Sequence, residues 1–105
     1  MEAVRIGHKG LKKGKVKTGH RSVQVSKSNR EEVLFVAQGQ GGPWTVVFDK
    51  REGSPFAKTS FTVPQGSFER TGPPTSSAVV HQKYRYSVYD AAGKRKDDPD
   101  VDIDN

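Results

Sequence analysis

The stretch from Glu31 to Asp49, EEVLFVAQGQGGPWTVVFD, decides the fold of this chain. Its first part, Val33 to Ala37, is an uninterrupted apolar run, which is typical of a β-strand covered on both faces. Glycines and a proline end that run at 39–43, and from Trp44 to Phe48 large apolar side chains alternate with smaller ones. We therefore expect two strands joined by a short glycine-rich link, either as a hairpin or as a tight crossover between sheets.

Short alternating segments recur on both sides of this stretch, at 3–6, 23–25, 61–63, 83–89 and 100–104. The clearest lies at Lys83–Tyr89, where Tyr84, Tyr86 and Val88 share one face. We expect the last segment to pair beside it as an edge strand whose aspartates face solvent. No longer segment has apolar residues at helical spacing. About seven short strands separated by Gly/Pro turns predict an all-β fold, an antiparallel two-sheet Greek-key sandwich, with a small barrel as the main competitor.

Length and composition limit the remaining possibilities. The 105 residues predict a single domain, 1–105, and only 31% of them are apolar, so the core must come from a few concentrated segments. No run reaches the roughly 20 apolar residues of a membrane span, and no stretch of signal-peptide type follows the first charges. These observations predict a cytoplasmic protein. The absence of cysteine excludes disulfides, thiolate metal sites and a thiol nucleophile.

Charge is unevenly distributed in a chain of net charge +6. A Gly/Lys-rich segment at about 7–21 contributes little to a core and is interpreted as a long basic loop or hairpin, and the C-terminal end at 97–105 is acidic. This asymmetry suggests a basic arm and an acidic tail. The candidate basic patch consists of Lys9, Lys12, Lys13, Lys15, Lys17 and Arg21.

The order of these segments resembles the cupredoxin-like family of β-sandwiches over about Ser22 to Asp104, although an immunoglobulin-like sandwich has similar strands. Family members have a V-x-F-V-N strand, a glycine turn, a P-H-x-V-x-F strand and a Y-x-Y-x-C strand. The chain is similar at 33–37, at 43–48 and at 84–88. The resemblance implies a copper site, but Trp44 stands in place of the first histidine and Val88 in place of the cysteine. An indole has no lone pair for a metal, so blue-copper chemistry is excluded and no cofactor is expected.

Other chemistries receive less support. His8, His20 or His81 could contribute to a metal site, but no pair has the short spacing of a structural zinc motif. The chain has no G-x-S-x-G elbow and no phosphate-binding loop followed by a helix, so we expect no enzyme activity. Nucleic-acid binding through the basic N-terminal region is the main alternative function, with Phe68 beside Arg70 or an exposed Tyr89 as base-stacking groups.

The preferred prediction is a non-enzymatic, metal-free module for protein interaction or structural assembly. A protein partner or self-association is expected, because the oppositely charged ends suggest head-to-tail pairing between neighbouring copies or binding of a charged partner. No membrane association is expected. The candidate surface is the mouth formed by 40–44 and 90–96, where the resembling family carries its site. Trp44 there is interpreted either as a plug of the sandwich or as an exposed aromatic anchor. The candidate residues are Gln40, Trp44, Asp90, Lys94, Arg95 and Lys96.

Overall fold

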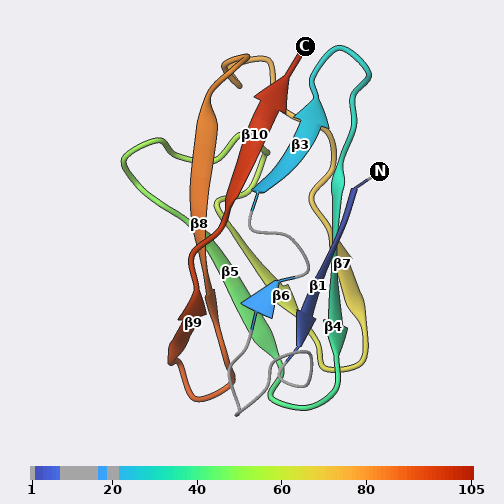
Figure 1. The fold of residues 1–105 in the computed structure, drawn as a ribbon, viewed down its shortest axis with the longest axis vertical. Helices are drawn as coiled ribbons and strands as arrows, with labels where there is room; N and C mark the ends of the chain where they lie inside the picture. Colours follow the sequence, from blue (N-terminus) through green and yellow to red (C-terminus); the bar gives the residue numbers. More distant parts are fainter. Residues whose placement is uncertain (1, 8–16, 19–21) are drawn as a thin grey trace.

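The computed structural model describes residues 2–7, 17–18 and 22–105, and within these residues it contains ten β-strands and no helix (Figure 1). No part of the described chain is therefore a helix that could span a membrane. The strands are β1 (Glu2–Gly7), β2 (Lys17–Thr18), β3 (Ser22–Ser26), β4 (Val33–Gln38), β5 (Trp44–Phe48), β6 (Ser60–Val63), β7 (Phe68–Arg70), β8 (Lys83–Tyr89), β9 (Arg95–Asp97) and β10 (Asp100–Asp104).

The smaller sheet has the strand order β2-β1-β4-β7. Its central pair, β1 and β4, is parallel, with Val4 opposite Phe35, and the two outer pairs are antiparallel. The strand β2 falls inside the segment that the sequence predicts to be a basic loop, and its residues pair with the end of β1. The described part of that segment is therefore strand, and the rest of it lies outside the described residues.

The larger sheet has the order β3-β10-β8-β5-β6. The short strand β9 also pairs with β8, and the register of this pair shifts between Val88 and Tyr89, as at a β-bulge. The strand β10 pairs with β8, as expected, but it also pairs in parallel with β3. Two predictions are therefore wrong: the strand pairing is mixed rather than antiparallel, and the aspartate-rich strand is internal rather than an edge. Most of the acidic C-terminal end is likewise a sheet strand and no free tail.

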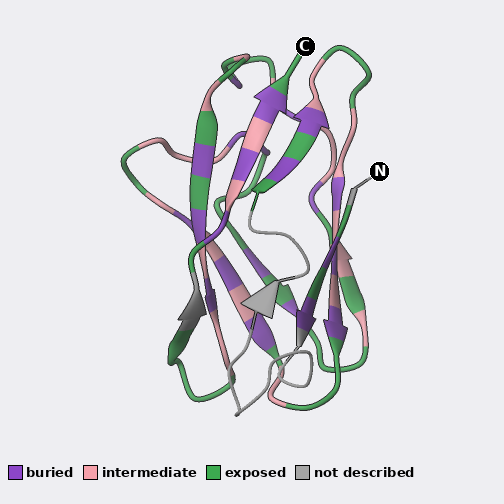
Figure 2. Cartoon of the chain, in the orientation of Figure 1, coloured by how far each residue is buried: buried purple, intermediate pink, exposed green. Residues whose placement is uncertain are grey.

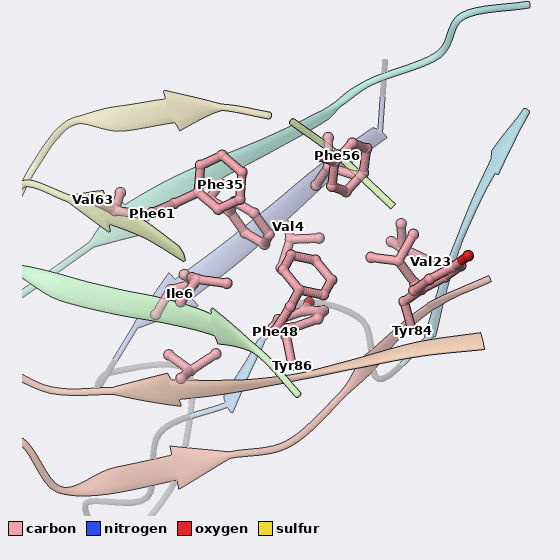
Figure 3. Packing of buried hydrophobic residues seen from close by; sticks show 14 of the residues in the cluster. Val4, Ile6, Val23, Phe35, Phe48, Phe56, Phe61, Val63, Tyr84 and Tyr86 are labelled. Carbon is pink, nitrogen blue, oxygen red and sulfur yellow. The ribbon is translucent and has the colours of Figure 1, made fainter. Parts of the chain in front are cut away.

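One hydrophobic core fills the space between the sheets (Figure 3). From the smaller sheet, the Phe35 ring meets the Tyr86 ring edge-on, with centroids 5.6 Å apart, and lies 6.1 Å from the ring of Phe61. The Phe48 ring extends the cluster, 5.3 Å from that of Tyr86. Aromatic pairs at such separations add about 0.5–1.5 kcal/mol beyond the area they bury. Phe35 therefore ties the two sheets together.

The glycine-rich link between β4 and β5 is a crossover, because the two strands belong to different sheets. The hairpin alternative is therefore wrong. Along β3, β8 and β10, buried residues alternate with exposed or intermediate ones (Figure 2). The apolar run of β4 also alternates between buried and intermediate exposure, although coverage on both faces was predicted. This difference decides where the candidate surface lies.

Candidate interaction surfaces

The predicted mouth is assembled from two loops that meet in space. The Ala91 N–H donates to the Gly41 carbonyl at 3.0 Å, which joins the β4–β5 link to the turn after β8. The Gly42 N–H donates to the Gln65 side-chain oxygen at 3.2 Å. Within the turn, the Asp90 carboxylate accepts from the N–H groups of Ala92 and Lys94, at 3.0 Å and 2.9 Å. The predicted residues are therefore close together, but Asp90 serves to fold the turn.

Trp44 lies beneath this mouth and is completely buried, with 0% of its surface exposed. A Cβ built on Gly41 would come within 2.8 Å of the Trp44 ring, so the link packs directly on the indole. The indole N–H has no hydrogen-bond partner among the described residues. Trp44 therefore fills the end of the core between the two sheets and has no exposed surface that a partner could contact. Its inclusion in the exposed candidate surface is wrong.

The remaining mouth residues contribute polar side chains. Gln40, Lys94 and Arg95 are exposed, and Lys96 belongs to β9 with a side chain outside the described part of the structure. The described side chains of the mouth are thus polar or cationic, over a packed tryptophan.

A second surface, which we call the β4 face, lies on the outside of the smaller sheet. The pairing register sets two rows of side chains across it, Arg5–Val36–Phe68 and Ala3–Leu34–Arg70. Phe68 is 57% exposed, and Val36 and Leu34 are partly exposed beside it. Large exposed apolar side chains that adjoin others mark contact sites more often than isolated ones do. The β4 face is the best candidate interaction surface of the described chain.

An ion pair borders the β4 face. The Arg70 guanidinium donates to both oxygens of Glu32, from Nε at 3.1 Å and from Nη2 at 2.7 Å. The hydrogen bonds from Arg70 lower the pKa of the Glu32 carboxyl, and the carboxylate in turn raises the pKa of Arg70. The bidentate geometry orients the Arg70 guanidinium toward Glu32, just before β4. Arg5, by contrast, forms no ion pair with another described residue.

The predicted basic patch and two of the predicted histidines cannot be placed. Lys9, Lys12, Lys13, Lys15, Arg21, His8 and His20 lie outside the described residues, as does the side chain of Lys17. His81 is exposed in the connection between β7 and β8, where its backbone N–H donates to the Ile103 carbonyl at 2.6 Å. Among the described residues, no three His, Asp or Glu side chains gather as a metal site would require.

Sequence reasoning named Phe68 and Arg70 only as base-stacking groups and did not find the β4 face. The signal was present in Val33 to Ala37, whose outward residues are apolar, but they were expected to be covered. The strand β7, which carries Phe68, has three residues and is too short to show alternation. Comparisons with protein-family models, with curated proteins and with solved structures found no match to this chain.

Proposed function

We propose that this chain is a non-enzymatic, metal-free module for protein interaction or structural assembly, which contacts its partner through the β4 face. The observation that supports this function is the exposure of Phe68, at 57%, next to Val36 and Leu34. Exposed aromatic residues lead among the groups that carry binding energy at protein interfaces. An outer sheet face with apolar central residues also favours a partner over water.

The scaffold we propose is a cupredoxin-like Greek-key β-sandwich that has no copper site. The full burial of Trp44 supports this interpretation, because the residue in place of the first histidine fills the end of the core. Its indole can donate a hydrogen bond and cannot coordinate an ion. The exposed residues at this end are polar or charged, whereas the β4 face presents exposed apolar side chains.

The experiment that tests the function compares Phe68→Ser with Val79→Ser, since Phe68 and Val79 are the large hydrophobic residues exposed in the described chain, at 57% and 52%. Val79 lies in the connection between β7 and β8, away from the β4 face. Each purified variant is measured for self-association by sedimentation and for protein capture from the native cell. We expect Phe68→Ser to lose association and Val79→Ser to keep it, with equal melting temperatures.

Two results would count against the proposal. Identical association of both variants and the unmodified protein would remove the β4 face from the function. Binding of single-stranded nucleic acid that weakens steeply with salt and depends on the basic residues at 9–21 would favour the alternative function instead. The bidentate contact of Arg70 with Glu32 argues against that alternative, because the guanidinium beside Phe68 already pairs with a carboxylate and not with a phosphate.

A further inference from the structure

The two rows of the β4 face have a distinctive order of chemistry. In the first row, the Arg5 cation and the Phe68 ring lie on either side of Val36, each one strand away. In the second row, the small Ala3 and the large Arg70 lie on either side of Leu34. Both rows therefore have an apolar residue in the middle. Their two ends differ: a cation and an aromatic ring in the first row, a small and a large side chain in the second.

We propose that a second copy of this chain covers the β4 face, related by a two-fold axis that runs along β4. This inference rests on the proposed function and names its partner. Such an axis keeps each row opposite the same row of the partner copy and reverses its left-to-right order. Arg5 of one copy then faces the Phe68 ring of the other, twice, and Val36 faces its own counterpart. A two-fold interface must be self-complementary in this way.

The second row supports the same arrangement. The axis places Ala3 of one copy opposite Arg70 of the other, so the smallest side chain of the face meets the largest. Arg70 is already held by Glu32 through two hydrogen bonds, at 2.7 Å and 3.1 Å, so its side chain is ordered before a second copy binds. Arg5 is free of ion pairs with described residues and is available to lie over an aromatic ring.

The size of the face predicts a weak dimer. Three strands about 4.8 Å apart and five residues of about 3.3 Å each give a platform of roughly 15 by 17 Å. A standard stable interface buries about 800 Å² on each partner, and smaller ones are transient. We therefore expect dissociation constants of tens to hundreds of micromolar, on the order of the affinities at the weak end of protein association.

A different packing of two copies is also conceivable from the charges. On the outside of the larger sheet, Asp100, Asp102 and Asp104 alternate along β10, and Arg5 of a neighbouring copy could face them. That contact joins two different faces, so it does not close and leads to open chains of copies. Asp100 already accepts a hydrogen bond from the Ser22 hydroxyl at 2.6 Å, and Asp100 and Asp102 lie in register with Arg85 and Lys83 of the same chain, which leaves the acidic row less in need of a cation from a neighbouring copy.

Sedimentation over a concentration range of about 10 µM to 1 mM tests the stoichiometry. The unmodified protein should reach a dimer and no larger species. Exposed cation–π contacts are worth about 0.5–1 kcal/mol each, so losing both should weaken the dimer by about five- to thirty-fold. We expect this loss from Arg5→Gln and from Phe68→Leu separately, and little further loss from the double variant, because the two residues contact each other. Val79→Leu is the control and should change nothing.

A short bismaleimide tests the geometry, since the chain has no cysteine of its own. Facing sheets lie about 10 Å apart, within reach of that reagent, so Val36→Cys should cross-link to itself and Val79→Cys should not. Two results would overturn the two-fold arrangement: cross-linking of Val36→Cys to Asp102→Cys in a mixture, or growth to open oligomers. Either would mean that the β4 face of one copy contacts the outside of the larger sheet of the next. A protein that stays monomeric to 1 mM also overturns the two-fold arrangement, and if Phe68→Ser still abolishes capture of another protein, the proposed function survives.

Discussion

Replacing Gly41 with alanine tests whether the β4–β5 link is held against Trp44. The backbone of Gly41 has a φ of +111°, in a region that L-residues rarely adopt, and a Cβ there would lie 2.8 Å from Cζ2 and 3.1 Å from Cη2 of the indole. The backbone strain alone costs about 1–3 kcal/mol. Overpacking against a buried ring adds about 1–3 kcal/mol. We expect Gly41→Ala to lower the free energy of unfolding by roughly 2–6 kcal/mol.

The matched control is Gly66→Ala. Gly66 also has a positive φ, +72°, but a Cβ there meets nothing within 4 Å. The control should therefore cost only the left-handed strain of about 1–2 kcal/mol. Urea unfolding of both variants can be followed through the fluorescence of Trp44, the single tryptophan of the chain. Equal losses for the two glycines would refute the packing of Gly41 on the indole.

A double-mutant cycle assigns the difference to the ring itself. In a Trp44→Leu background, circular dichroism replaces fluorescence as the measurement, and the clash with Gly41→Ala disappears with the indole. The extra cost of Gly41→Ala over Gly66→Ala should then shrink by the overpacking part, about 1–3 kcal/mol. An unchanged extra cost would mean that backbone strain alone accounts for the effect.

Two further predictions concern the border of the smaller sheet. The buried Thr71 hydroxyl accepts from the Val33 N–H at 2.9 Å, so Thr71→Val should lower the free energy of unfolding by about 1–3 kcal/mol, whereas Thr62→Val on an exposed position of β6 should leave the urea midpoint unchanged. The pKa of Glu32 is lowered from 4.5 in the folded chain, so the stability that its pairing with Arg70 contributes is complete above pH 4.5 and is lost as pH falls through the folded pKa. Glu32→Gln should therefore flatten the curve of unfolding free energy against pH below pH 4.5 only. An unchanged curve would contradict the role of the ion pair.

The main strands could be predicted from the sequence because each buries one face and alternates along its length. Tyr84, Tyr86 and Val88 of β8 are all buried, as their shared parity predicts. The strands that were missed, β2, β7 and β9, have two or three residues each, which is too short for a period of two to be visible. Their existence depends on neighbouring strands rather than on their own composition.

Strand order and direction could not be predicted, because side chains alternate in the same way in parallel and antiparallel pairs. The pairing of β3 with β10 joins Val23 to Val101 across 78 positions of the chain, and nothing local in either segment indicates it. The aspartates of β10 were taken as protection for an edge, but their neighbours β3 and β8 instead supply a hydroxyl from Ser22 and cations such as Arg85 in register.

The proximity of the two loops of the mouth could be predicted, because glycine-rich links and turns fall at the ends of strands, and the hydrogen bond from Ala91 to Gly41 joins them there. The use of the mouth as an interaction surface stays a prediction. For Trp44 the sequence favoured a plug over an exposed anchor, since a tryptophan at the end of a core strand more often fills the end of the sandwich. The complete burial of its side chain confirms the plug.

The contrast between outer faces within one chain is the strongest argument for the β4 face. Outward positions of β3 and β10 are Ser, Gln and Asp, and those of β8 begin with Lys83 and Arg85, as solvated sheet faces require. On β4 the outward positions are Leu34, Val36 and Gln38, so two of the three are apolar, and in register with Val36 lies an exposed phenylalanine. The fold would form with polar residues there, because the inward Val33, Phe35 and Ala37 supply the core. Each apolar Å² that a partner removes from water contributes about 25 cal/mol, so covering Phe68 and the exposed parts of Leu34 and Val36 would stabilise a complex through area that the monomer leaves in water.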